Sequence, residues 1–275
     1  MSNLKPFVKW VGGKRQIIDI LQNHLPEQYD RYFEPFIGGG ALLFHVQPKK
    51  ATVNDINQQL INAYQWIKFD VELVIRLLCI FDNIDCNRDY YYTLRDLYNR
   101  KIDLRIFDAE AAALMIWINK RCFNGLYRVN KNGFFNVPYN NKVSCVSADK
   151  DNLRNISKYL NTNDIQILNL DFEQSLSDIQ HNDFVYFDSP YDPISNTANF
   201  TQYNKNGFTQ SDHCRLYHVF KSLDNIGVKC MLSNHDTELI RSLYRNFNIR
   251  NINVKRSINR NSSLRTGQEL IITNY

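Results

Sequence analysis

Four residues that follow an apolar run hold the most specific chemical signal in this chain. Asp188, Ser189, Pro190 and Tyr191 come directly after Phe184-Val185-Tyr186-Phe187, a run typical of a buried strand. Asp188 and the backbone carbonyl of Ser189 can each accept one N–H of an exocyclic amine, and the proline keeps the residue before it extended. Tyr191 can stack on a flat base. The tetrapeptide predicts chemistry on an amino-bearing ring, although a lone Asp at a strand end is often only a helix cap.

Methylation is the reaction that this arrangement favours. The lone pair of an exocyclic amine is delocalised into its ring, and two acceptors that engage both N–H bonds would aim it at an incoming methyl group. Attack on a sulfonium methyl is then an in-line displacement that depends on positioning and requires no metal. A base in a duplex must first leave the stack, because an enzyme cannot reach its amino group there.

A glycine turn and an acidic residue predict a nucleoside-containing cofactor. Gly38, Gly39 and Gly40 stand between an expected strand and an expected helix, where a tight turn lets a ligand approach the backbone. Asp55 ends the next expected strand, near the spacing at which an acid meets ribose hydroxyls. The glycines do not follow G-x-G-x-x-G and the turn has no basic residue, so S-adenosylmethionine is favoured over a pyrophosphate cofactor. A plain structural turn is the alternative.

Four further residues could line a cofactor pocket. Trp10 and Lys14 flank a glycine pair near the N-terminus, and the segment fails the G-x-x-x-x-G-K-[ST] pattern of a phosphate loop. The ammonium of Lys14 could instead face the carboxylate of a methyl donor, whereas for Trp10 taken alone ordinary core packing is the favoured interpretation. After a strand expected at residues 165–168, Asp171 and Phe172 offer an acceptor for an adenine amino group and a ring to cover it.

These residues need a parallel sheet to bring them together. Strand-like runs at residues 31–35 and 51–55 alternate with a helical pattern, which indicates a βαβ unit. Residues 71–120 have helical periodicity, and residues 121–145 resemble loops and a short hairpin. We expect an α/β fold whose sheet comes from two sequence halves. Its remaining strands are expected at residues 165–168, 184–187, 228–232, 249–254 and 270–273.

Composition excludes several classes of protein. The chain has 275 residues and a formal net charge of +5, which is only a weak indication of a polyanionic partner. No apolar run is long enough to span a membrane, and the N-terminus lacks a signal region, so we expect an intracellular protein. The six cysteines form no C-x-x-C pair, which disfavours both a zinc site and a disulfide framework.

Taken together, these segments resemble the Dam family of DNA adenine-N6 methyltransferases, most closely the D12-class restriction-system members that act on GATC. The resemblance covers almost the whole chain. It rests on residues 9–14, 33–40, 55–57 and 188–191, on Phe123-Asn124-Gly125-Leu126-Tyr127-Arg128 and Phe135-Asn136-Val137-Pro138-Tyr139, and on Leu232-Ser233-Asn234.

The resemblance implies a Rossmann-like methyltransferase sheet with helices on both faces, formed by residues 1–68 and 150–275. A mainly α-helical target-recognition domain, residues 69–149, would be inserted into it. Trp10, Lys14, Asp55 and Asp188 would line the S-adenosylmethionine pocket above Gly38 and Gly40, with Asp171 and Phe172 at its adenine.

The resemblance also implies double-stranded DNA as the partner, base flipping as the route to the adenine and no metal. Arg128 would read a guanine and Leu126 a thymine methyl group. Phe123 and Asn124 would support the flipped-out site, and Lys9 and Asn136 would make further DNA contacts. For Arg128 alone, a phosphate contact is an equal alternative. A cognate restriction nuclease and a monomeric enzyme are further expectations.

Two departures from the family pattern leave alternatives open. Ser189 stands where the family usually has a second proline, so loop rigidity is in question, although the backbone carbonyl is kept. Asn140-Asn141-Lys142 replaces glycine and basic or aromatic residues. A DNA-binding relative with impaired catalysis, or an enzyme acting on RNA or cytosine N4, is therefore the alternative. The basic stretch from Lys255 through Arg260 and Arg265 could hold phosphates or be a solvated loop.

Overall fold

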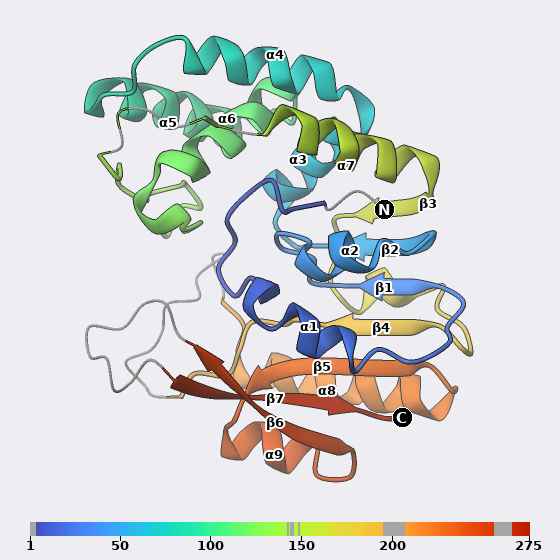
Figure 1. Ribbon diagram of the computed structural model, residues 1–275. Helices are drawn as coiled ribbons and strands as arrows, with labels where there is room; N and C mark the ends of the chain where they lie inside the picture. The colour runs from blue at the N-terminus through green and yellow to red at the C-terminus, as the bar shows by residue number, and fades with distance from the viewer. Residues whose placement is uncertain (1–3, 142, 144–145, 148, 195–206, 256–265) are drawn as a thin grey trace.

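A seven-stranded mixed sheet forms the centre of the computed structural model (Figure 1). The structure describes residues 4–141, 143, 146–147, 149–194, 207–255 and 266–275. The strand order is β3-β2-β1-β4-β5-β7-β6. The strands are β1 Tyr32–Glu34, β2 Lys50–Asn54, β3 Asp164–Leu168, β4 Phe184–Phe187, β5 Lys229–His235, β6 Asn248–Lys255 and β7 Thr266–Thr273.

The strand order places a switch point between β1 and β4. Strands β1 to β5 pair in parallel, whereas β7 is antiparallel to both β5 and β6. The chain winds outward from β1 to β3 and then returns to β4 on the other side of β1. In open α/β sheets of this kind, ligands bind beyond the carboxyl ends of the strands at the switch point.

Both faces of the sheet are covered by helices. In β4, Phe184 and Tyr186 belong to one apolar cluster, while Val185 and Phe187 belong to a second one. The first cluster is completed by α1 Ile18–Gln22, α2 Ala41–Val46, α3 Gln58–Phe69 and α7 Lys150–Thr162. The second packs against α8 Gln210–Asn225 and α9 Glu238–Leu243, so α2 and α8 lie on opposite faces in Figure 1. All four β4 side chains are buried for this reason.

Three helices follow α3 at one end of the sheet. They are α4 Val71–Asp82, α5 Arg88–Asp103 and α6 Ala109–Arg121. Each begins at a side-chain cap, because Asp70, Asn87 and Asp108 accept hydrogen bonds from backbone N–H groups of the first turn. The alanine run lets neighbouring helices approach α6 closely, and residues 111–118 are buried.

The helical segment shares the core of the sheet. A single apolar cluster contains Leu78 of α4, Trp117 of α6 and Val53 of β2. Residues 122–139 then return beside α6 with two isolated antiparallel bridges, Cys122 to Tyr139 and Val129 to Phe135, in the stretch where the sequence predicts loops and a short hairpin. The domain boundaries at residues 69 and 149 stay a prediction.

The expected strands are present, and all except residues 184–187 differ at their ends. The strands expected at residues 31–35, 51–55 and 165–168 are Tyr32–Glu34, Lys50–Asn54 and Asp164–Leu168. The strand expected at residues 228–232 extends to His235, that at 249–254 widens to residues 248–255, and that at 270–273 begins at Thr266. Polar residues at these ends pair along the antiparallel ladder, so apolar runs underestimate its length. Lys142 and most of the basic stretch, residues 256–265, lie outside the described residues. Within the described part of the chain, no helix has the length and apolar character of a membrane span.

Candidate active site

The glycine turn after β1 is held in a conformation that side chains would disrupt. Gly38 and Gly40 have φ values of 48° and 71°. A Cβ on Gly38 would lie 2.6 Å from Cδ1 of Trp10, and one on Gly40 would lie 2.6 Å from the hydroxyl of Tyr64. That hydroxyl donates to the carbonyl of Gly38 at 3.0 Å. The turn therefore requires glycine for two reasons, its left-handed backbone and its close neighbours.

Asp55 is the acidic residue bound to this turn. Its two carboxylate oxygens accept the backbone N–H groups of Gly38, at 3.0 Å, and of Asn57, at 2.8 Å. Burial raises the pKa of Asp55 to about 6, although these two donors lower it. Each oxygen has a further lone pair, so the carboxylate can still accept hydroxyl donors from a ligand.

Lys14 and Asp188 form an ion pair at the end of β4. Nζ of Lys14 lies 2.5 Å from Oδ1 of Asp188, donates to the carbonyl of Gly12 at 2.6 Å and lies 4.5 Å from the centre of the Tyr191 ring. Burial raises the pKa of Asp188, and the Lys14 cation opposes that rise. The sequence suggests that Lys14 faces a donor carboxylate. Its structural partner is Asp188. Acceptors in the described part of the chain take two of its three N–H groups, which leaves the third for a donor carboxylate.

The rest of the tetrapeptide is anchored by β5 and β7. The hydroxyl of Tyr191 donates to Oε2 of Glu269 at 3.1 Å, and its ring meets His235 edge-on. The backbone N–H of Asp192 donates to Asn234 at 2.9 Å. Ser189 is buried. Because the segment is fastened on both sides of Pro190, these contacts can limit its movement where a second proline is absent.

Glu34 is a buried carboxyl to which the sequence assigns no role. It ends β1 and accepts a hydrogen bond from the hydroxyl of Tyr32 at 2.8 Å. Burial and, to a smaller extent, the nearby Asp188 charge raise its pKa to about 8, although the hydrogen bond from Tyr32 lowers it. The only feature of the sequence that could have marked Glu34 as functional is its place as an acidic residue at the end of a strand, directly before Pro35.

Asp171 and Phe172 follow β3, and Phe172 packs beside the start of the glycine turn. The ring of Phe172 stands 5.3 Å from that of Phe36, and both oxygens of Asp171 are bound, by the N–H of Glu173 and by Arg215. The guanidinium of Arg215 also covers the Phe172 ring at 4.4 Å. Sequence reasoning missed Arg215, because nothing in the sequence relates α8 to this strand end.

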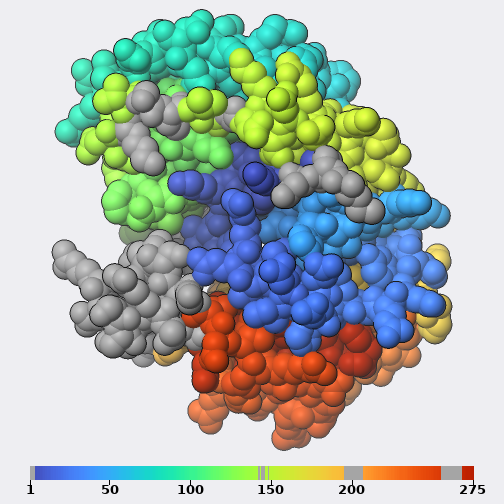
Figure 2. Space-filling view, in the orientation of Figure 1, coloured from blue at the N-terminus to red at the C-terminus, as the bar shows by residue number. Residues whose placement is uncertain are grey.

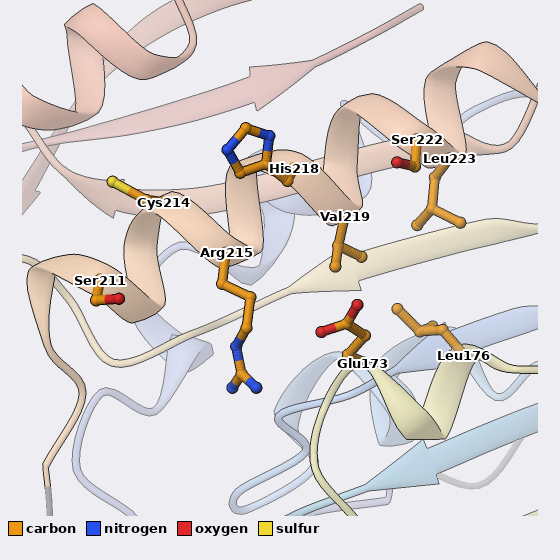
Figure 3. Close-up of a pocket in the computed structure, with 9 residues that line it drawn as sticks. All are labelled: Glu173, Leu176, Ser211, Cys214, Arg215, His218, Val219, Ser222 and Leu223. Atoms are coloured by element: carbon orange, nitrogen blue, oxygen red, sulfur yellow. The ribbon is translucent and has the colours of Figure 1, made fainter.

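A surface hollow of about 480 Å³ is lined in part by Arg215 (Figure 3). It lies between α8 and the segment after Phe172, and the side chains of Arg215 and Glu173 point into it. The tetrapeptide residues are absent from its lining. Its residues are Glu173, Leu176, Ser211, Cys214, Arg215, His218, Val219, Ser222 and Leu223.

The N-terminal segment joins the sheet to the helical segment. Asn119 of α6 accepts the N–H of Lys9 and donates to the carbonyls of Lys9 and Gly125. A Cβ on Gly125 would lie 2.5 Å from Cδ of Lys9. Trp10 stacks on Tyr127 with ring centres 5.1 Å apart. Figure 2 shows this dark-blue segment against the green surface of the helical segment.

The residues expected at DNA lie on one stretch beside Lys9. Nε of Arg128 donates to Oδ1 of Asn136 at 2.8 Å, and Arg128 is exposed. Phe123 is 52% exposed, and Asn124 has a φ of 56°. Leu126 is half-buried. The structure therefore brings Lys9 and Arg128 into one region, connected to the glycine turn through Trp10 and Tyr127.

Comparison with known proteins identifies the family. The model of the D12 class N6 adenine-specific DNA methyltransferases matches residues 10–258. The chain belongs to this family. The matched span includes the glycine turn, the Lys14–Asp188 pair and the segment around Arg128. The chain is therefore an adenine-specific DNA methyltransferase of the D12 class, and DNA is its substrate.

Relatives of the D12 family match over nearly their full length. The chain is 44% identical over 275 residues to the Type II methyltransferase M1.LlaDCHI of Lactococcus lactis subsp. cremoris, covering 99% of this chain and 96% of that protein. It is 39% identical to the Type II methyltransferase M.MjaIII of Methanocaldococcus jannaschii, covering 99% of both. It is 31% identical to the DNA adenine methylase of Serratia marcescens, covering 95% of this chain and 94% of that protein.

Family membership settles the substrate class among the alternatives. The D12 description is adenine-specific and names DNA, which leaves RNA and cytosine N4 without support. Methyltransferases of this kind generally use S-adenosylmethionine. In the part of the chain that the structure describes, no cluster of three or more His, Cys, Asp or Glu side chains could hold a metal ion.

Proposed function

We propose that this enzyme transfers a methyl group from S-adenosylmethionine to N6 of a flipped-out adenine in double-stranded DNA, within the sequence GATC. The observation that carries this proposal is the Lys14–Asp188 pair at the carboxyl end of β4, beside the glycine turn. A carboxylate that is paired with a buried lysine at the switch point of a parallel sheet can accept an N–H of the base.

The pocket beside the glycine turn fits the methyl donor. S-adenosylmethionine supplies an electrophilic methyl group on a sulfonium. Asp55 has the acceptor chemistry for ribose hydroxyls, and Gly38 and Gly40 leave room that a Cβ would occupy. The free N–H of Lys14 suits a carboxylate. Arg215 fixes Asp171 and Phe172, which would border the adenine of the donor.

At the base, two acceptors would share the amino group. Asp188 takes one N–H and the backbone carbonyl of Ser189 the other, which directs the nitrogen lone pair away from the ring plane. Tyr191 is anchored through Glu269 and would stack on the adenine. The reaction forms an N–C bond, breaks the S–C bond and leaves one amino proton to be released. Energy for flipping the base would come from stacking and backbone contacts.

Recognition of the sequence would fall to residues 69–149 and Lys9. The exposed Arg128, held through Nε by Asn136, is suited to the O6 and N7 atoms of a guanine. Leu126 would contact a thymine methyl group, and the exposed Phe123 would enter the space left by the flipped base. The Type II names of two relatives make a cognate restriction nuclease a reasonable partner of this enzyme as well.

Digestion of plasmid DNA tests the reaction and the sequence together. Plasmid from a methylation-deficient host, incubated with the enzyme and S-adenosylmethionine, is expected to resist a GATC nuclease that adenine methylation blocks. It should be cut by a GATC nuclease that requires adenine methylation. Methylated adenine by nucleoside mass spectrometry with unchanged GATC cutting would refute GATC and keep the reaction. No methylated adenine would support the alternative of a relative with impaired catalysis.

Arg128→Ala is expected to relax one base position of the recognition sequence. Loss of a bidentate contact should cost roughly 1 to 3 kcal/mol against the cognate base and little against a site already substituted there. The measurement is kcat/KM on oligonucleotides substituted at each position in turn. Lys131→Ala, which removes an exposed cation from the same segment, is the control. An equal loss on every sequence from Arg128→Ala would make it a phosphate contact.

A further inference from the structure

Among the described residues, the two that contact the Asp188 carboxylate closely, Lys14 and Ser233, meet the same oxygen. Nζ of Lys14 lies 2.5 Å from Oδ1, and the hydroxyl of Ser233 donates to Oδ1 at 3.2 Å. Oδ2 is the oxygen that neither residue engages. The side chain of Asp188 is 20% exposed, whereas that of Lys14 is 6% exposed. The carboxylate thus has one oxygen held by Lys14 and Ser233 and a second that neither of them holds, on a side chain that is partly exposed.

Ser233 is itself held from behind by Tyr186. Their hydroxyl oxygens are 2.9 Å apart, and both residues are fully buried. A hydroxyl has one proton, which Ser233 gives to Asp188, so the Tyr186 hydroxyl must be the donor in the second bond. Tyr186 and Asp188 are two residues apart on and after β4, while Ser233 lies on the adjacent β5. Tyr186 therefore donates to Ser233, and Ser233 donates to Oδ1 of Asp188.

These two hydrogen bonds restrict the terminal side-chain torsion of Asp188. The terminal torsion of an aspartate is broad and roughly two-fold, so a carboxylate held by a single flexible lysine can rotate and exchange its oxygens. A second donor that comes from a buried strand removes this freedom. Rotation matters for transfer, since the acceptor must lie within hydrogen-bond distance of the amine.

We propose that Ser233, supported by Tyr186, is a positioning residue that fixes Oδ1 of Asp188 and so presents Oδ2 to the amino group of the base. The inference rests on the proposed function, because it assigns a use to an oxygen of the proposed acceptor. It goes beyond that function by giving the two oxygens different tasks and by adding two residues that do not touch the substrate.

Ser233→Ala tests the proposal in the full-length enzyme. Single-turnover transfer of tritiated methyl groups to a GATC duplex should slow by about 10- to 50-fold, in the range for a lost hydrogen bond to a charged group. The KM values for S-adenosylmethionine and DNA should stay within about twofold. Tyr186→Phe should show a smaller loss, about two- to fivefold, because Ser233 keeps its bond to Asp188.

The pH dependence separates positioning from a purely structural role. Burial raises the pKa of Asp188, whereas Lys14 and the Ser233 hydroxyl lower it. The charge of Glu269 also raises this pKa, and Glu34 and Tyr191 are the other titratable groups nearby. Without that hydroxyl the pKa of Asp188 rises, and the acidic limb of the rate profile should move up by about half a unit to one unit. Structural loosening alone would lower the rate without moving this limb.

Ser157→Ala is the matched control, because it removes a buried hydroxyl from α7, a helix that packs against β3, three strands away from β4. It should leave the rate and the acidic limb unchanged. A wild-type rate in Ser233→Ala, or a slower rate with an unmoved limb, overturns the positioning role and leaves the proposed function intact. Absence of methyl transfer by the wild-type enzyme would instead overturn the proposed function, and the inference with it.

Discussion

Asp188→Ala is expected to abolish methyl transfer to DNA while largely keeping S-adenosylmethionine binding. The change removes the acceptor for the adenine amino group and leaves the buried Lys14 cation without its ionic partner. Loss of one preorganised polar group at a reacting centre costs roughly 10²- to 10³-fold in kcat, and a charged one should cost at least that. Single-turnover transfer of tritiated methyl groups and calorimetric donor binding measure the two effects separately.

Asp188→Asn provides a second variant that keeps the shape of the side chain. It should be nearly as inactive, because a neutral amide cannot balance Lys14 and accepts more weakly than a carboxylate. Asp178→Ala is the control, since Asp178 is an exposed carboxylate that pairs with Arg31 before β1. Transfer near the wild-type rate in either Asp188 variant would contradict the role of this carboxylate as acceptor.

The sequence predicts the catalytic sheet well because its signals are local. The apolar run 184–187 and the acidic residue after it define both a buried strand and its carboxyl end, and β4 has those bounds. The glycines after β1 are likewise required where they stand, with positive φ at Gly38 and Gly40. Features of this kind depend on neighbours in the chain, so one sequence is enough to find them.

Contacts between distant segments could not be predicted in the same way. Ser233 meets Asp188 only because β5 lies beside β4, and Arg215 meets Asp171 only because α8 crosses the sheet at that strand end. A serine in a strand and an arginine in a helix are unremarkable locally. Glu34 is similar, since its raised pKa comes from burial by elements distant in sequence. The ion pair between Lys14 and Asp188 is another contact between segments that are distant in the sequence.

Lys14→Met is expected to lower kcat by roughly 100-fold at neutral pH and to move the acidic limb of the rate profile upward. Burial raises the pKa of Asp188, and the Lys14 cation is the largest influence that lowers it. Removing one member of a buried pair leaves an unpaired charge at a cost of roughly 3 to 5 kcal/mol, which protonation of Asp188 can relieve. A protonated carboxyl accepts poorly, so the rate should fall most at low pH.

The sign of this pH effect distinguishes the explanation from simple loss of donor binding. With Lys14 absent, raising the pH should ionise Asp188 and recover part of the rate, whereas a defect in binding S-adenosylmethionine would disappear at saturating donor. Rate profiles at saturating donor and DNA measure the difference. Lys101→Met, which removes a lysine paired with Asp108 and Glu110 away from β4, should leave the limb in place. An unmoved acidic limb in Lys14→Met would show that Lys14 does not set the charge of Asp188.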